Sequence, residues 1–483
     1  MPAIYCTVAL VALVWGAIFL LRGSLVGGCL AYLLATACFG YEFCHFAWGP
    51  LPLTLDRLVL LALVIAYLVQ RGLGRTERRP PQRIDLLLAV FLGLLLASTF
   101  WGALPADPKM LPLRLVGGYL IPCLVYWIAR QIPLDRTRIE MIHGVLAGLG
   151  IYLGITGVLE ITGQWWAVFP SHIADPAVGL HFGRARGPMV HAVSFGMYTG
   201  VGLLAVWVWQ GRFGRLGRLL LMTSVPVILA ALYGSYTRSV WMGTGLGVFL
   251  VLALTLHGGW RSLVLGGLLS ASLLLALTRM DSMVSFQREL PGSYAGKSVE
   301  LRGEIAYVSW KMFLDRPLLG FGFDQYPRAK LAYLADRSTT LDLEATRECV
   351  HHNTFLSLLT ETGLTGLALY VAILATWARS AWRLARRADL PDWIRNQAAL
   401  TLGALGLYCC LASFHEISYL SMNSVLLFFL AGITTGLQAH VTGMADARTD
   451  PQRAAPRSGA LLGMPGDCPD FCGTRLQKWD CPL

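Results

Sequence analysis

Long apolar runs constrain this chain more than any other feature of its sequence. Runs of about 17–22 residues with almost no charged side chain recur along most of its length. A lipid bilayer offers no hydrogen-bond partners, so each run must satisfy its own backbone, which an α-helix does. Charged residues make up only 14% of the 483 residues, whereas soluble proteins carry roughly 25%. The sequence therefore predicts an all-α polytopic membrane protein, with the lipid bilayer as a partner.

About twelve to thirteen transmembrane helices are expected from these runs. The first run has no basic residue before it and no cleavage site after it. It is therefore expected to be a retained span rather than a signal peptide. The expected spans lie near residues 3–21, 24–43, 56–70, 85–104, 114–129, 141–162, 191–210, 219–235, 239–257, 262–278, 354–378, 397–414 and 419–438.

Basic residues in the connectors predict the orientation. Cytoplasmic connectors of membrane proteins are enriched in Lys and Arg. One alternate set of connectors holds 18 arginines, whereas the other short connectors and their edges hold six basic residues. We therefore expect the first set to be cytoplasmic, which places the large loop before residue 354 on the outer, periplasmic side. The net charge of +11 is concentrated in these connectors, so no nucleic-acid partner is expected.

The chain is expected to divide into four parts. Residues 1–278 hold ten spans with short loops, and residues 354–438 hold the last three. Between them lies one large polar loop, residues 279–353, which is the expected catalytic region. Residues 439–483 are rich in Pro, Gly, Asp and Arg without apolar periodicity, so a disordered cytoplasmic tail is expected.

Within the large loop, two helices are expected. Glu304–Leu314 has the apolar spacing of an amphipathic helix, and it should end before residues 315–317, which finish in proline. A turn is expected at residues 320–322, and a second helix at residues 326–335.

Four polar groups on the expected outer side are candidates for chemistry. They are Arg184 with Arg186, Arg238, Arg302, and His351-His352-Asn353 with Glu361 in the following span. Each has a structural alternative: outer arginines contact lipid head groups, and a lone histidine is more often structural than catalytic. An arginine held against the positive-inside bias, or an acid inside a span, is nevertheless a functional candidate. Glu160 and Glu416 share this status with less support.

Taken together, these residues suit the displacement of a phosphate leaving group. Arginine forks bind phosphate with two hydrogen bonds and a permanent charge. A histidine can take a proton from an attacking hydroxyl near neutral pH. The eleven cysteines show no metal-ligand spacing, so neither a metal nor a cofactor is expected. Nucleotides are not expected on the outer side, which favours an activated lipid as donor.

Three segments carry a resemblance to a known family. Residues 236–243 contain a Thr-Arg-Ser turn followed by an apolar span, and Arg302, Trp310 and residues 315–322 form the pattern R…W…DRPLLGxG. Residues 350–366 form the pattern HNTF…ETGxxG. In this order and spacing they resemble the O-antigen ligase and O-antigen polymerase family of bacterial membrane glycosyltransferases.

The resemblance implies an undecaprenyl-pyrophosphate-linked glycan as donor, in the bacterial inner membrane. His352 would be the general base on the acceptor hydroxyl, and Arg238 and Arg302 would hold the pyrophosphate. Metal-independent transfer with inversion at the anomeric carbon is implied as well. His351 departs from the family, whose usual residue there is small, so it is either a bystander or the base. The implied substrate-binding residues are Arg184, Arg186, His351, Asn353 and Glu361.

We therefore expect a membrane glycosyltransferase of the ligase type, with lipid A–core as acceptor. A polymerase that extends a glycan, or a protein O-oligosaccharyltransferase, fits the motifs equally well. A transporter or flippase of lipid-linked sugars is the alternative from another class. It is disfavoured because the spans carry few charges besides Glu160, Glu361 and Glu416. A scaffold protein does not explain the outer arginines.

Overall fold

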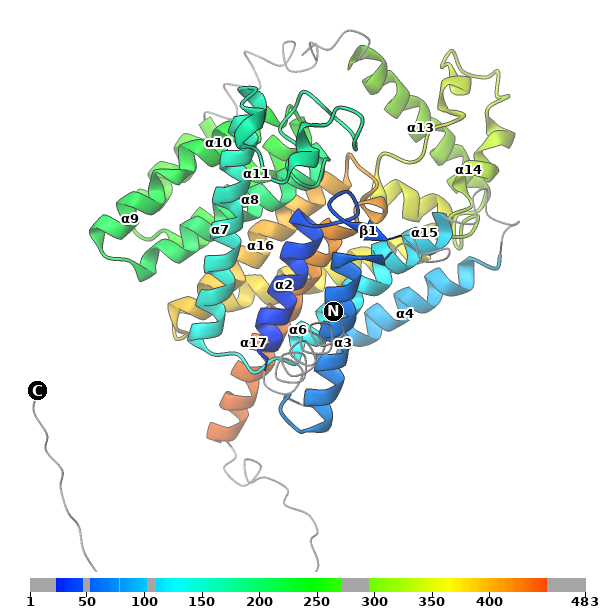
Figure 1. Cartoon of the computed structure of the whole chain (residues 1–483). Helices are drawn as coiled ribbons and strands as arrows, with labels where there is room; N and C mark the ends of the chain where they lie inside the picture. Colours follow the sequence, from blue (N-terminus) through cyan, green and yellow to red (C-terminus); the bar gives the residue numbers. More distant parts are fainter. Residues whose placement is uncertain (1–22, 47–52, 78, 102–109, 271–294, 450–483) are drawn as a thin grey trace, which may run out of the picture. The chain divides into compact units, whose positions relative to one another are not determined.

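The computed structural model describes residues 23–46, 53–77, 79–101, 110–270 and 295–449. Most of these residues are helical, as Figure 1 shows, and the protein is an all-α polytopic membrane protein. Among the described residues the strands are β1 (His45–Phe46) and β2 (Leu53–Thr54), a short antiparallel pair. The chain separates into two units, Met1–Ala439 and His440–Leu483. The site described below belongs to the first.

Seven helices of the described residues are long and apolar enough to cross a membrane. Each coincides with a predicted span. They are α5–η1–α6 (Met110–Pro112, Leu113–Leu120, Ile121–Arg130), α7 (Arg136–Ile161), α8–η4 (Ala192–Trp209, Gln210–Arg212), α9–α10 (Arg215–Met222, Ser224–Gly234), α11 (Arg238–Thr255), α15 (Thr354–Arg386) and the first part of α17 (Ser421–Thr449).

Four further predicted spans are helices that are shorter or more polar. α2 (Leu25–Cys38) has 14 residues, α4 (Arg83–Ser98) has 16, and α3 (Leu55–Gly72) carries charges at both ends. α16 (Asp392–Ala412) has 21 residues but begins with a polar turn. Most of α16 is buried against other helices, so it does not need to be as apolar as a lipid-facing helix. The two remaining predicted spans are 3–21 and 262–278. All of the first, and residues 271–278 of the second, lie outside the described residues.

The central helices α7, α8, α11 and α16 pack side by side (Figure 1). Small residues allow α7 and α8 to approach closely: a Cβ added to Gly150 would lie 2.6 Å from the Cα of Gly202. Such contacts are typical of membrane helices, because lipid tails provide no hydrophobic force between them. Larger residues at these two positions would push the bundle apart.

Both helices predicted within the large loop are present. α13 (Ala295–Asp315) contains the predicted amphipathic segment and ends before Pro317. The second prediction corresponds to α14 (Tyr326–Ala329) and the 3₁₀ turn η5 (Lys330–Tyr333). A further turn, η6 (Leu343–Thr346), follows. These elements share a small apolar core formed by Ile305, Val308, Met312, Tyr326, Leu334 and Leu343.

The other connectors that position the site differ in length, and the α7–α8 loop spans residues 162–191. The α7–α8 loop contains the 3₁₀ turns η2 (Trp165–Ala167) and η3 (Ser171–Ala174), and η7 (Ile417–Tyr419) joins α16 to α17. α17 continues to Thr449, beyond the predicted end of the last span at residue 438. The rest of the predicted disordered tail lies outside the described residues.

Candidate functional site

The His351-His352-Asn353 turn is fastened to the connector between α16 and η7. The Asn353 side chain accepts a hydrogen bond from the Leu356 amide at 3.0 Å, which caps α15, and donates to the Ser413 carbonyl at 2.9 Å. Thr354 donates to the His415 carbonyl at 2.9 Å. An Asn at a helix N-cap is a common stabilising choice, and here it also fixes the position of His352 beside a second segment.

The Thr-Arg-Ser turn meets the same connector. Ser239, in the first turn of α11, lies 2.9 Å from Nε2 of His415 through its hydroxyl. The preceding Tyr236 has a φ of 45°, an unusual conformation for a bulky residue that is typical of functional sites. The Thr-Arg-Ser turn is therefore joined to the connector that also holds His352, through the contact of Ser239 with His415.

Arg302, on α13, supplies positive charge to this region. Burial and then the charge of Arg302 lower the pKa of His352. The same two causes, in the same order, lower the pKa of His415. Both imidazoles are therefore neutral at pH 7, and a neutral imidazole can accept a proton. The predicted residues Arg302, His352 and Asn353 are thus brought together, and Arg238 precedes Ser239, which contacts His415.

The α7–α8 loop contributes a third group of residues. Burial and the charge of Arg184 lower the pKa of His191 to about 4. The rings of His191 and His181 meet edge to face, with centroids 4.9 Å apart. His191 and His181 also contribute to the lowered pKa of His415. The predicted residue Arg184, which is buried, therefore lies beside a histidine that couples electrostatically to the site.

Arg186 is used differently from its neighbour. Its guanidinium donates to four loop carbonyls, those of Val178, Leu180, Ile173 and Asp175, at 2.6, 3.5, 3.0 and 2.7 Å. The amides of Arg186 and Gly187 donate to the carboxylate of Glu160 at 3.2 and 2.8 Å. Arg186 and Glu160 thus hold the loop in shape, and the predicted phosphate contact of Arg186 stays a prediction.

His351 points into the protein. It is 3% exposed, its Nε2 lies 2.9 Å from the Thr360 hydroxyl, and its ring stacks on Tyr326 with centroids 3.5 Å apart. Burial, Arg114, Lys330 and His352 all lower its pKa. A side chain enclosed in this way has no path to a substrate hydroxyl. Of the two interpretations of His351, this geometry favours the structural one.

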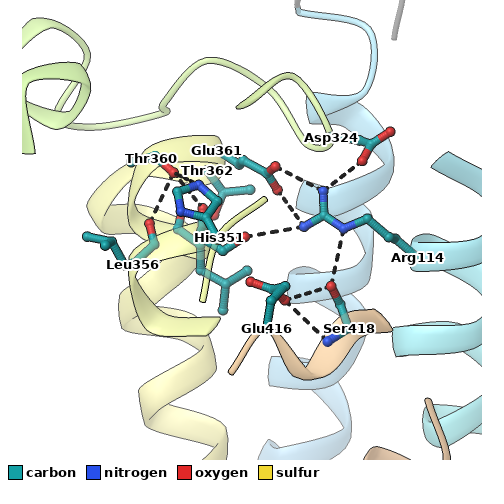
Figure 2. A network of polar contacts seen from close by, with 11 residues as sticks. Arg114, Asp324, His351, Leu356, Thr360, Glu361, Thr362, Glu416 and Ser418 are labelled. Atoms are coloured by element: carbon teal, nitrogen blue, oxygen red, sulfur yellow. Dashed lines mark hydrogen bonds and ion pairs between the residues drawn. The ribbon is translucent and has the colours of Figure 1, made fainter. Parts of the chain in front are cut away.

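A buried network centred on Arg114 lies beside His351 (Figure 2). All five N–H groups of its guanidinium have partners, which are Asp324 (2.7 Å), both carboxylate oxygens of Glu361 (2.9 and 3.0 Å), Ser357 (3.2 Å) and Ser418 (3.2 Å). The rings of Phe323 and Tyr419 lie 4.7 and 5.0 Å from its central carbon. The predicted substrate residue Glu361 is therefore engaged by Arg114, and the network joins η1, the large loop, α15 and η7.

α15 is interrupted at Gly363, and the large loop fills the interruption. Gly363 has φ 66° and ψ −167°, and its neighbours Leu364 and Thr365 donate to the carbonyls of Pro317 and Leu318 at 2.8 and 3.2 Å. In return, amides of the 315–322 segment donate to carbonyls of α15: Phe321 to Thr360 at 3.0 Å, and Gly322 to Glu361 at 2.8 Å. The DRPLLGFG and ETG segments are thus partners in one backbone arrangement.

Residues 223–371 match the family model described as O-antigen ligase. The chain carries an O-antigen ligase domain. No curated protein matches the chain. The matched residues run from the start of α10 to the middle of α15, and they include Arg238, Arg302 and His352.

The O-antigen ligase domain does not contain the whole candidate site. Arg114, Arg184, His191 and His415 lie outside residues 223–371. His415 and Arg114 were not predicted as site residues from the sequence. A signal for Arg114 was available, because it is an arginine of the basic-poor connectors at the edge of an apolar run. His415 had none beyond its place in a short outer connector.

The site combines neutral imidazoles with arginines at the end of a helical bundle. This combination can accept a proton and bind an anion at the same time. Within the described ranges, no group of three His, Cys, Asp or Glu side chains is arranged to hold a metal ion.

Proposed function

We propose that this protein is an inner-membrane glycosyltransferase that moves a glycan from undecaprenyl pyrophosphate to an acceptor hydroxyl on the periplasmic side. The observation that carries the proposal is a neutral His352, beside Arg302 and fastened to the connector that Ser239 contacts, in a chain with an O-antigen ligase domain. The arginine-poor connectors support the periplasmic placement of this end.

His352 acts as the general base in the proposed reaction. The acceptor hydroxyl gives its proton to the imidazole, and its oxygen forms a bond to the anomeric carbon of the first sugar. The bond from that carbon to the pyrophosphate oxygen breaks, with inversion. Undecaprenyl pyrophosphate leaves with the bonding electrons, and an imidazolium remains on His352 until it loses its proton to water.

Arg238 and Arg302 bind the pyrophosphate and offset the negative charge that develops on it as it leaves. Arg184 adds a contact to a phosphate or to a sugar, supported by its place beside His191. Asn353, His351, Glu361 and Arg186 act as positioning residues, since their polar groups engage the protein itself.

The acceptor in this proposal is lipid A–core, which corresponds to a ligase. Growing polymer and protein serine are the acceptors that a polymerase and a protein O-oligosaccharyltransferase would use. Each acceptor is offered separately in the test below, so the product identifies the subtype.

Purified protein in detergent is given the lipid-pyrophosphate-linked glycan with each acceptor, and released undecaprenyl pyrophosphate is measured by mass spectrometry together with the new glycoside. We expect His352→Ala to lower the rate at least about a hundredfold, the scale for losing a general base. Arg347→Ala, an exposed change in the same loop, is the matched control and should keep the rate. Full release by His352→Ala would refute the mechanism, and glycolipid movement without release would indicate a transporter.

A further inference from the structure

A pocket of about 670 Å³ opens at the other end of the helices that carry the candidate site. It is bounded by the first turns of α7 and α16 and the last turns of α8 and α11. The candidate site is built at the opposite ends, where α8 and α11 begin and α16 finishes. α8 has 18 residues and is therefore about 27 Å long, close to the roughly 30 Å hydrocarbon core of a bilayer. The pocket thus lies at the opposite membrane boundary.

The pocket carries an excess of positive charge. Its charged lining consists of Arg136, Arg212, Arg218 and Arg395 with Glu140 and Asp392. Glu140 is shared by Arg136 (2.6 Å) and Arg212 (3.3 Å), and Asp392 pairs with Arg395 (3.2 Å). Arg218 is then left without an acidic partner among the residues that the structure describes. Such a cluster of arginine guanidinium groups suits a phosphate group.

Apolar surface adjoins the arginines. Arg218 lies on the short helix α9, whose Leu216, Leu219 and Leu220 are 70, 64 and 63% exposed. Trp207 and Trp209 line the pocket, and tryptophan is enriched at the boundary between membrane and water. A ligand with its phosphate beside Arg218 would therefore have apolar side chains directly next to it.

We propose that this pocket binds the phosphate headgroup of an anionic phospholipid, with an acyl chain lying along the leucines of α9. Basic pockets between membrane helices bind such head groups through arginine and lysine. The leucines favour a lipid over a soluble phosphate compound, because an acyl chain attached to the phosphate would contact them. This site is separate from the proposed donor site, because the two lie at opposite ends of the same helices.

Native mass spectrometry of the full-length protein in detergent tests the proposal, with cardiolipin as the probe and phosphatidylcholine as the reference lipid. We expect cardiolipin to bind more tightly than phosphatidylcholine. In the double variant Arg212→Gln, Arg218→Gln the affinity for cardiolipin should fall by about tenfold or more, since each arginine beside an anionic head group adds to the free energy of binding. The double variant Arg379→Gln, Arg383→Gln, in the last turns of α15 and outside the pocket lining, should bind as the original protein does.

The lipid proposal is wrong if cardiolipin binds no more tightly than phosphatidylcholine. It is also wrong if both double variants lose the same amount of affinity for cardiolipin. Leu216→Ser with Leu220→Ser should weaken cardiolipin and leave any binding of inorganic phosphate unchanged. If inorganic phosphate or ADP displaces cardiolipin at equal concentration, the ligand is a soluble phosphate compound and the lipid assignment is wrong. Both arginines of the first variant are exposed, and a melting curve confirms that it folds.

Discussion

His352 owes its proposed role to two effects that act in the same direction. Burial and the charge of Arg302 both disfavour the imidazolium, so the pKa of His352 lies below its ordinary value of about 6.5. The neutral base therefore persists to lower pH than it would in water. When His352 takes a proton during transfer, the same effects favour its rapid release.

Replacing Arg302 should change the pH dependence of the reaction. In Arg302→Gln the pKa of His352 rises, because a positive neighbour is lost, and the acid limb of kcat/KM moves to higher pH. The rate at neutral pH should also fall about a hundredfold, the scale for one lost contact to a developing anion. Arg302→Lys keeps the charge and should leave the acid limb in place. A limb that moves equally in both variants, measured by release of undecaprenyl pyrophosphate, would contradict the assignment.

At this scale the sequence predicted the residues that belong to motifs. Arg302 and His352 were expected together and lie close enough to interact electrostatically, whereas for Arg238 only the adjacent Ser239 contacts the same connector. His415 was not expected, because its partner Ser239 lies 176 positions away in the chain. The pairing of Glu160 with the amides of Arg186 and Gly187 was invisible for the same reason: spacing reveals neighbours within one helix, and not across a loop.

Among the elements, α15 differs most from its sequence pattern. An apolar run of this length predicts one continuous helix, whereas the structure breaks it at Gly363. Broken helices within membrane proteins are tolerated where other protein groups satisfy the freed backbone. Residues 317–322 provide those groups, and nothing in the run itself identifies which segment would do so.

Gly363→Ala should destabilise the protein strongly. A Cβ at this position would lie 2.3 Å from the carbonyl carbon of Leu318, at a φ of 66° and ψ of −167°, a region that only glycine adopts readily and that costs about 1–3 kcal/mol for other residues. The added contact with the Leu318 backbone increases that cost. Gly148→Ala in α7, where a Cβ would meet nothing within 4 Å, should be neutral or slightly stabilising. Melting temperatures in detergent compare the two, and equal values would contradict the prediction.

The predicted spans succeeded and failed for physical reasons. Helices with much of their surface exposed, such as α9–α10 and α11, were recognised from hydropathy, because lipid contact demands apolar side chains. α8 was recognised as well, although its most apolar stretch is 89% buried, whereas the enclosed α16 is more polar, and its Gln397 is bonded to His143 and Thr401 within the bundle. Hydropathy therefore identifies spans, but it does not distinguish helices that face lipid from helices enclosed by protein.

Across the whole molecule, Arg114 joins parts of the chain that lie up to 304 positions apart. Its side chain is 2% exposed, and that of Glu361 is 1% exposed. Removing one member of a buried ion pair leaves the other charge without compensation. The network is therefore expected to matter for assembly of the site more than for binding of substrate.

Arg114→Met should lower the free energy of unfolding by about 3–5 kcal/mol, the usual cost of breaking a buried pair. Adding Glu361→Gln should recover part of this loss, because it removes one of the two carboxylate charges, Glu361 and Asp324, that Arg114 had paired. Arg347→Met, at an exposed pair in the large loop, should have little effect. Unfolding curves in mild detergent measure these three variants and Glu361→Gln alone. A loss in the double variant that equals the sum of the two single losses would argue against the pair.

Chelation should leave the proposed reaction intact, because arginines supply the positive charge at the leaving pyrophosphate. EDTA treatment followed by gel filtration should change the rate of donor turnover by less than about twofold, whereas metal-assisted transfer would lose most of its rate. Recovery of a lost rate on addition of Mg²⁺ or Mn²⁺ would contradict the roles given to Arg238 and Arg302.

The exchange of backbone hydrogen bonds between residues 317–322 and the interruption of α15 determines how this protein can be recombined. A chimera that replaces only the large loop would separate two segments whose backbone groups hydrogen-bond to each other around Gly363. A crossover placed after residue 366 would transfer both partners together. Exchanges of acceptor specificity between relatives should therefore succeed only when the loop and the first turns of α15 are inherited as one block.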